Sequence, residues 1–197
     1  NLGKLFPEIE IKTTNYALIK DKSDITQNED LLPGLLKTCT LGYDGKGQFI
    51  INNKEEISKL EIDFNKEYIL EKKISLKKEI SIIVTRFSNN ECLIFEPLEN
   101  HHINQILNKS IIPANITKDI FEKAQRQAKL IAENLKYIGT MCVEYFIDEK
   151  NSLFINEIAP RVHNSGHLTI NAYNISQFEN HIRAVCNLEK VELKKIH

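Results

Sequence analysis

The sequence predicts an α+β protein, built mainly from antiparallel strands with helices packed against them. Short β-branched runs joined by polar turns, such as residues 79–87 and 91–95, indicate strand hairpins. Residues 117–135 instead repeat their apolar side chains with the 3.6-residue period of a helix. At 197 residues and 42% hydrophobic content, the chain can bury the core of one ordinary domain or two small ones.

Composition excludes several classes of function. With 26 basic and 27 acidic residues, the net charge of −1 gives no footprint for nucleic acid or an anionic membrane. No apolar run has membrane-spanning length, and residues 1–12 carry charges that a signal peptide lacks. The chain starts without Met, so we expect a piece of a longer protein. The cysteines are widely spaced and predict reduced thiols in a cytoplasmic protein: Cys39, Cys92, Cys142 and Cys186.

The first part of the chain predicts short strands around a glycine-rich loop. Residues 23–30 are polar and predict a turn, and Asn53 is a plausible N-cap for a short helix to about Leu60. Strands are expected at residues 16–20, 35–39, 48–51 and 68–71.

The second part predicts a hairpin, a long helix, a second hairpin and a final helix. Residues 74–78 read as a link, and residues 98–107 as a polar and then apolar stretch without assigned structure. Thr117 caps the long helix and Gly139 is its predicted stop. Strands 141–147 and 152–158 flank the turn 148–151. The last helix has a predicted capping box and an apolar core face: Ser176 with Glu179, and Phe178, Ile182 and Val185.

Residues 154–167 (FINEIAPRVHNSGH) begin as a strand and end in a loop dense in hydrogen-bonding groups. Pro160 ends the strand and Gly166 permits an unusual backbone angle. This density of charge and imidazole at a strand end favours a functional site over a plain surface turn. His163 and His167 could hold zinc on a helix, but the Pro and Gly indicate a loop, which disfavours zinc.

A glycine loop spans residues 42–48, between two predicted strands. Glycines at 42, 45 and 47 let backbone N–H groups approach a phosphate, and Lys46 adds charge. The spacing is not that of a Walker A loop, and no helix follows as in a dinucleotide fingerprint. A phosphate-covering hairpin and an ordinary glycine-rich turn both remain open here.

Two acidic residues, Glu144 and Glu157, lie in otherwise apolar strands. If the turn 148–151 pairs residues whose numbers sum to about 299, Glu144 faces Ile155 and Glu157 lies diagonally on the same face. Two such carboxylates repel unless a cation lies between them, and oxygen ligands suit Mg²⁺. The alternative is an exposed acid and a buried acid paired with Arg161.

Three motifs together resemble the ATP-grasp superfamily, and within it the 5-(carboxyamino)imidazole ribonucleotide synthases of purine biosynthesis. They are residues 35–48 (LLKTCTLGYDGKGQ), the acid pair, and residues 156–167 (NEIAPRVHNSGH). The resemblance covers about residues 11–188. Biotin carboxylases would carry Asn where Ala159 stands, and the formate-dependent transformylases usually carry Asp-Thr-Gly after their Pro-Arg-x-His run.

The resemblance implies an ATP-grasp fold with two subdomains. Residues 1–73 would form the small lid subdomain with the phosphate loop, and residues 74–197 the larger core with the magnesium and substrate site. Lys72 and Lys73 replace the usual Gln-Gly of the hinge, and Glu96 replaces a usual proline. The family's N-terminal and C-terminal domains are not in this chain, so we expect it to bind ATP without completing turnover.

The resemblance also implies roles for individual residues. Lys37 and the glycine loop would hold the phosphates, residues 71–74 would lie by the adenine, and Glu79 would bind the ribose. The metal ligands would be Glu144 and Glu157, and the catalytic residues Arg161 and His163. Substrate would meet Tyr43, Asp44, Arg161, His163 and Asn164. ATP would meet Lys37, Gly42, Tyr43, Asp44, Gly45, Lys46, Gly47, Gln48, Glu71, Lys72, Lys73, Ile74, Glu79, His102, Asn156 and Glu157.

The implied cofactors are ATP and Mg²⁺, and the implied reaction is carboxylation of 5-aminoimidazole ribonucleotide by bicarbonate through carboxyphosphate. The expected partners are these small molecules, without nucleic-acid polymer or membrane, and the intact enzyme would be compatible with a homodimer. Two alternatives stay open: a module that senses ATP without carboxylation, and another ATP-grasp carboxylate ligase.

Overall fold

The computed structural model describes residues 11–39, 47–103 and 106–196. Their antiparallel sheets and packed helices confirm the predicted α+β class. The chain divides into two compact units, with Thr14–Ser75 forming the smaller one and most of the remaining residues the larger. Within the described residues, no helix is both long and apolar enough to cross a membrane.

The smaller unit is a four-stranded antiparallel sheet with short helices. Its strand order is β1-β4-β2-β3. The predicted turn at residues 23–30 is wrong, because Asp21 and Asp24 form a capping box that starts a helix. Asn53 caps the next helix as predicted. The elements are β1 (Tyr16–Ile19), α2 (Lys22–Gln27), η1 (Glu29–Leu31), β2 (Gly34–Thr38), β3 (Gln48–Ile51), α3 (Lys54–Ser58) and β4 (Tyr68–Lys72).

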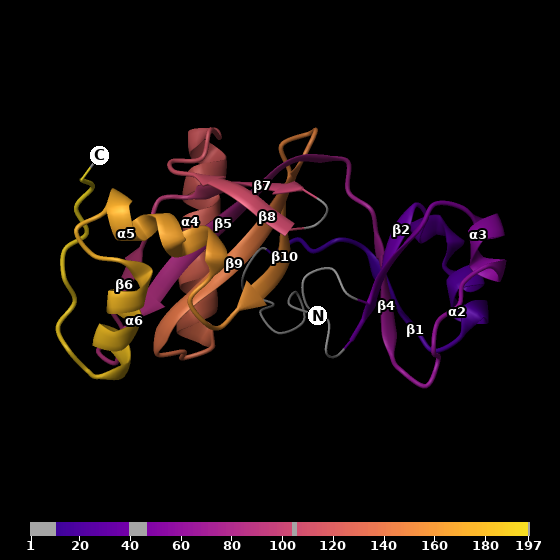
Figure 1. Ribbon diagram of the computed structural model, residues 1–197, viewed down its shortest axis with the longest axis horizontal. Helices are drawn as coiled ribbons and strands as arrows, with labels where there is room; N and C mark the ends of the chain where they lie inside the picture. Colours follow the sequence, from indigo (N-terminus) through magenta and orange to yellow (C-terminus); the bar gives the residue numbers. More distant parts are fainter. Residues whose placement is uncertain (1–10, 40–46, 104–105, 197) are drawn as a thin grey trace. The chain divides into compact units, whose positions relative to one another are not determined.

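The larger unit is built on a six-stranded sheet of order β10-β9-β5-β7-β8, with β6 paired to β5 (Figure 1). The stretch at residues 98–107, left unassigned above, supplies two strands. The predicted link at residues 74–78 already contains the start of β5. The strands are β5 (Leu76–Arg86), β6 (Cys92–Ile94), β7 (Leu98–Ile103), β8 (Ile106–Ile111), β9 (Gly139–Asp148) and β10 (Leu153–Ala159).

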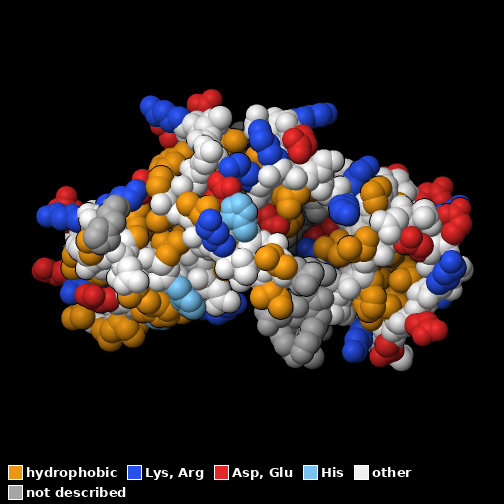
Figure 2. Space-filling view, turned by 45° about the horizontal axis from the view of Figure 1, so that its top comes forward, with side chains coloured by type: hydrophobic (Ala, Val, Ile, Leu, Met, Phe, Trp, Pro, Cys, Tyr) orange, Lys and Arg blue, Asp and Glu red, His pale blue; other side chains and the backbone are white. Residues whose placement is uncertain are grey.

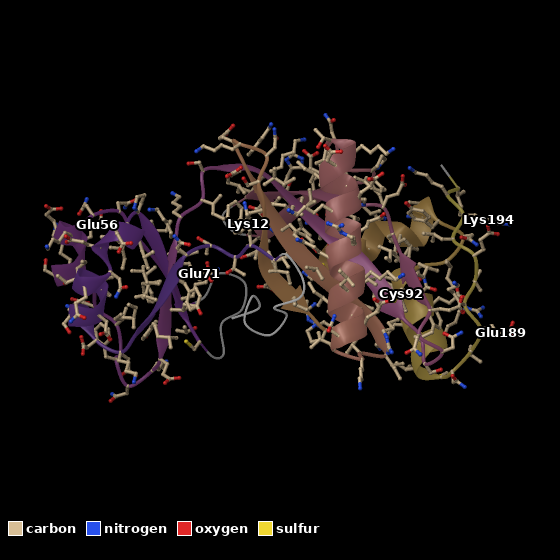
Figure 3. All side chains as sticks on the ribbon, turned by 180° about the vertical axis from the view of Figure 1, so that it is seen from behind. Lys12, Glu56, Glu71, Cys92, Glu189 and Lys194 are labelled. Atoms are coloured by element: carbon tan, nitrogen blue, oxygen red, sulfur yellow. The ribbon has the colours of Figure 1, made fainter. Side chains whose placement is uncertain are left out.

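Helix α4 (Lys118–Asn134) lies across one face of this sheet (Figures 1 and 3). Thr117 caps it as predicted, and its apolar side chains pack with those of β5 and β9. Gly139 is not its stop. The helix ends five residues earlier, with Lys136 at φ 50°, and Gly139 (φ 121°) opens β9.

The opposite face carries the residues that follow β10. They form η2 (Asn164–Leu168), α5 (Thr169–Ala172) and α6 (Gln177–Val185). The Ser176 side chain accepts a hydrogen bond from the Glu179 N–H and so caps α6, while the Glu179 carboxylate accepts from Arg183. A sheet face bounded by α6 and η2 therefore holds the polar side chains described next.

Candidate functional site

Strands β9 and β10 place the two predicted metal ligands directly opposite each other. Ile155 pairs with Tyr145, whereas Glu157 pairs with Glu144, because a bulge at Asn156 shifts the register. The predicted pairing of Glu144 with Ile155 is therefore wrong. The two carboxylates nonetheless share one sheet face.

The surroundings of Glu144 disfavour the charged form of its carboxyl group when no cation is bound. Burial, and then the charges of Glu157 and Glu79, raise its pKa to about 7 from an ordinary 4.5. Arg161 and a hydrogen bond from Asn156 act in the opposite direction. Opposed carboxylate oxygens that repel each other form a donor set that suits a hard divalent cation such as Mg²⁺.

A third acid lies on the same face, on the neighbouring strand β5. Glu79 of β5 has its Oε2 2.6 Å from Nδ1 of His102 on β7. Burial raises the pKa of Glu79, and the nearby His102 opposes that rise. The structure therefore brings Glu79, His102, Glu144 and Glu157 together on one face.

His163 is the N-cap of η2 and lies against Glu144, with its Nε2 3.3 Å from Oε1. Burial and then the charge of Arg161 lower the pKa of His163 to about 4, so its imidazole is neutral at neutral pH. The contact with Glu144 is therefore not a salt bridge. Arg161 and Asn164 are exposed beside it, with the Arg161 Nη1 donating to the Val162 carbonyl at 3.0 Å.

Sequence reasoning assigned no role to the buried polar residues that surround His163, although Ser165 lies in the predicted functional loop. Ser81 and Ser165 are fully buried and their hydroxyl oxygens lie 2.7 Å apart. Gln177 is also fully buried, and its amide accepts from the His163 N–H at 3.0 Å and donates to the His163 carbonyl at 2.7 Å. One signal was available for Ser81, which interrupts an isoleucine run two residues from Glu79 and so shares its face.

A buried cysteine, Cys142, lies next to Glu144 and His163. Ligand atoms of Cys142, Glu144 and His163 all lie within 4.8 Å of one another, a spacing that a transition metal could use. Complete burial raises the pKa of the Cys142 thiol well above its ordinary value, which disfavours the thiolate that zinc requires. His167 stacks on Phe178 at a centroid distance of 5.5 Å, outside this trio. The donor set therefore favours carboxylate oxygens over a sulfur site.

In the smaller unit, Lys37 Nζ lies 2.6 Å from Glu71 Oε2, with Glu71 on β4 (Figure 3). Lys37 also pairs with Gln48 across β2 and β3. Gly47 has φ 77°, and a Cβ there would come within 2.8 Å of the Thr38 hydroxyl. The other predicted loop residues lie outside the described part: Gly42, Tyr43, Asp44, Gly45 and Lys46.

Two of the predicted hinge residues form hydrogen bonds with the segment that precedes β2. Lys72 donates from Nζ to the Asp30 carbonyl at 2.9 Å, and the Lys73 N–H donates to the Pro33 carbonyl at 2.9 Å. Ile74 is half-buried. The two lysines that stand where the resemblance expects Gln-Gly are therefore both held by hydrogen bonds to the segment before β2.

Comparison with known proteins places this geometry in a family. The ATP-grasp domain family matches residues 4–178. The chain belongs to the ATP-grasp family. The ATP-grasp fold predicted above is thereby confirmed.

Several ATP-grasp proteins are similar to this chain. N5-carboxyaminoimidazole ribonucleotide synthase of Bacillus subtilis is 46% identical over 178 residues, which are 88% of this chain and 46% of that protein. An ADP complex of N5-carboxyaminoimidazole ribonucleotide synthetase has a TM-score of 0.91 at 39% identity, covering 99% of this chain and 52% of the other. The chain thus spans about half the length of the relatives it matches.

A further ATP-grasp structure contains both nucleotide and substrate. It is N5-carboxyaminoimidazole synthase of Aspergillus clavatus in complex with ADP and 5-aminoimidazole ribonucleotide. Its TM-score is 0.84 at 27% identity, covering 95% of this chain and 50% of the other.

Proposed function

We propose that this ATP-grasp chain provides the nucleotide and carboxylation site of an N5-carboxyaminoimidazole ribonucleotide synthase. The observation that carries the proposal is the opposed pair Glu144 and Glu157 with neutral His163 3.3 Å from Glu144. The similar proteins named above support the same substrate class. Because the chain spans about half of those proteins, the complete reaction is proposed for the intact protein.

The proposed reaction begins when a bicarbonate oxygen attacks the γ-phosphorus of ATP. The bond between that phosphorus and the β,γ-bridging oxygen breaks, which gives carboxyphosphate and ADP. The exocyclic amine of 5-aminoimidazole ribonucleotide then takes the carboxyl group, directly or as released CO₂, and phosphate leaves. The amine loses one proton in this step.

Glu144 and Glu157 would hold Mg²⁺, and their mutual repulsion is relieved when a cation lies between them. When bound, the ion neutralises charge that develops on the phosphoryl oxygens. Glu79 and His102 would lie at the ribose, and Asn156 beside the metal ligands.

Other residues would serve the phosphates and the anions of the second step. The Lys37 ammonium would neutralise phosphate charge together with the glycine loop. The planar guanidinium of Arg161 can hold bicarbonate or carboxyphosphate through two parallel hydrogen bonds. His163 is a neutral imidazole, so one ring nitrogen can donate a hydrogen bond while the other accepts one.

The test is ATP hydrolysis by the intact protein, measured with 5-aminoimidazole ribonucleotide in the presence and absence of bicarbonate. We expect hydrolysis that requires Mg²⁺ and both substrates. Glu144→Gln and Glu157→Gln should each lower it by about a hundredfold or more, since each removes a charge from the metal site. Glu179→Gln, whose carboxylate pairs with Arg183 on the surface, is the matched control and should behave like the wild type.

Three results would contradict the proposal. ATP binding without substrate-dependent hydrolysis indicates a sensor module. Hydrolysis that depends on another carboxylate indicates a different ATP-grasp ligase. Near-normal activity in both glutamine variants rejects the metal assignment.

The location and assembly are also expectations. The free cysteines Cys39, Cys92, Cys142 and Cys186 suit a reducing cytoplasm. We expect the intact protein to bind small molecules, in a form compatible with a homodimer.

A further inference from the structure

A chain of buried hydrogen bonds runs from β7 through β5 to the imidazole of His163. Asn100 Nδ2 donates to the Ser81 hydroxyl at 3.0 Å, and the Ser81 hydroxyl donates to the Ser165 hydroxyl at 2.7 Å. The Ser165 hydroxyl lies 2.9 Å from His163 Nδ1. Asn100 is 6% exposed and both serines are fully buried, so water does not compete for these groups.

The chemistry of the groups limits the direction of the donors in this chain. An amide nitrogen can only donate, so the Ser81 oxygen accepts from Asn100, whose carbonyl oxygen accepts from Ser110 at 2.8 Å. Each serine has a single hydroxyl proton. Ser81 directs its proton to Ser165, which leaves the Ser165 proton for either His163 Nδ1 or the Cys142 sulfur.

A second donor points at the same ring nitrogen. The backbone N–H of Ser165 lies 3.4 Å from Nδ1 and can only donate. The Cys142 thiol also neighbours the two serine hydroxyls, but sulfur is a weaker acceptor than a ring nitrogen that already accepts this backbone N–H. Nδ1 therefore carries a lone pair, so the ring holds only one proton, on Nε2, and is neutral.

The position of the ring is set independently by α6. Gln177 holds both the N–H and the carbonyl of the His163 peptide group. A Cβ at Gly166 would lie 2.5 Å from the Gln177 side chain, so a glycine at this position leaves room for Gln177 to reach the His163 peptide group. Nε2 then faces Glu144 Oε1 at 3.3 Å.

We infer that Ser165, oriented by Ser81 and Asn100, is a positioning residue that holds His163 as a neutral hydrogen-bond donor through Nε2. His163 thus presents an N–H group to the site and is not the base that removes the amine proton. The role in carboxylation rests on the proposed function, whereas the tautomer does not.

The tautomer is measured by long-range proton–nitrogen NMR on the chain labelled with ¹⁵N-histidine. The sequence contains 6 histidines, and His163 is assigned by the signals that disappear in His163→Gln. At neutral pH we expect an unprotonated, hydrogen-bonded Nδ1 and a protonated Nε2. Ser165→Ala should move the Nδ1 signal toward that of a nitrogen without a hydrogen bond.

Tyr145→Phe is the matched control, because it removes another buried hydroxyl from the same sheet. That hydroxyl donates to the Ala124 carbonyl of α4 at 3.1 Å and lies outside the serine chain, on the α4 side of the sheet. It should leave the His163 signals unchanged. A protonated Nδ1 in the wild type, or wild-type His163 signals in Ser165→Ala, would overturn the inference.

Turnover of the intact protein separates the donor role from the proposed function. Ser165→Ala should lower kcat roughly tenfold, because a functional histidine has lost its orienting partner. His163→Gln keeps an N–H donor and should retain more activity than His163→Phe; equal loss in both would reject the donor role. If no variant or wild-type protein carboxylates the ribonucleotide, the proposed function fails while the NMR result still decides the tautomer.

Discussion

Glu144 illustrates how a single side chain is held in a state that water alone would not favour. Its carboxyl group shares a sheet face with Glu157 and Glu79, and burial limits the water that could screen them. The folded protein therefore keeps a proton on Glu144 to a higher pH than the unfolded chain does. The raised pKa of Glu144 applies to the protein without metal, because a bound cation favours the charged carboxylate.

The pH dependence of stability should report this directly. The pKa of Glu144 is about 7 when folded and 4.5 ordinarily, so its contribution to the free energy of unfolding falls as pH rises between these values. Glu144→Gln stays neutral throughout. In denaturant titrations without divalent metal, the variant should gain stability over the wild type across this window, by up to about 3 kcal/mol.

His163 shifts stability in the other direction. Its pKa is lowered from 6.5 to about 4, so its contribution is lost as pH falls through that range. This loss occurs in both proteins and largely cancels in their difference. A difference between variant and wild type that does not change with pH would contradict the assigned environment of Glu144.

At the scale of elements, α6 buries a different side from the one predicted from its sequence. The predicted core face is wrong, because Phe178, Ile182 and Val185 are 36%, 55% and 49% exposed. The buried side chains are instead Gln177, Asn180 and Ala184. Gln177 must face inward to hold His163, and this requirement turns the apolar side outward, toward the left end of the larger unit in Figure 2.

Two identical substitutions in two helices test this orientation. Ile131→Ala in α4 removes a fully buried side chain and should cost about 2–5 kcal/mol of unfolding free energy. Ile182→Ala in α6 should cost less than about 1 kcal/mol, because the side chain is 55% exposed. Thermal or denaturant unfolding of the chain measures both. Equal losses would show that α6 buries its apolar side.

The sequence was informative where local chemistry decides structure. Caps at Thr117 and Asn53, and the two hairpins of the larger unit, follow from side chains that act on their own neighbourhood. Prediction from the sequence failed where contacts with residues distant in the chain determine the structure. One case is the orientation of α6, and another is the polar stretch that becomes β7 and β8 by pairing within the larger sheet. The clustering of Glu79 with Glu144 is likewise tertiary and became visible only with the strand order.

At the scale of the whole molecule, each compact unit has a hydrophobic core of its own. In the smaller unit Ile19, Leu36, Ile51 and Leu70 are all fully buried in one cluster. The clusters of the larger unit are formed by β5 and β9 with α4 on one face, and with α6 and its neighbours on the other. Separate cores predict that the units can lose structure separately.

Leu70→Ala should therefore act on one unit alone. Removing this fully buried side chain should cost about 2–5 kcal/mol in the smaller unit. Amide hydrogen exchange should accelerate in β1, β2, β3 and β4 and remain unchanged in β5 and β9. Acceleration throughout the chain would show that the two units unfold as one.

The bulge at Asn156 changes which side of the sheet the following residues of β10 face. Up to Ile155, β10 directs every second residue at α4; if Asn156 were paired regularly with Glu144, Glu157 would fall on the same side as Ile155 and enter that apolar layer. One inserted residue returns Glu157 to the opposite side, beside Glu144. The metal site therefore depends on Asn156 staying outside the pairing. Deleting Asn156 should leave Glu157 opposite Glu144, because Glu157 would then follow Ile155 directly.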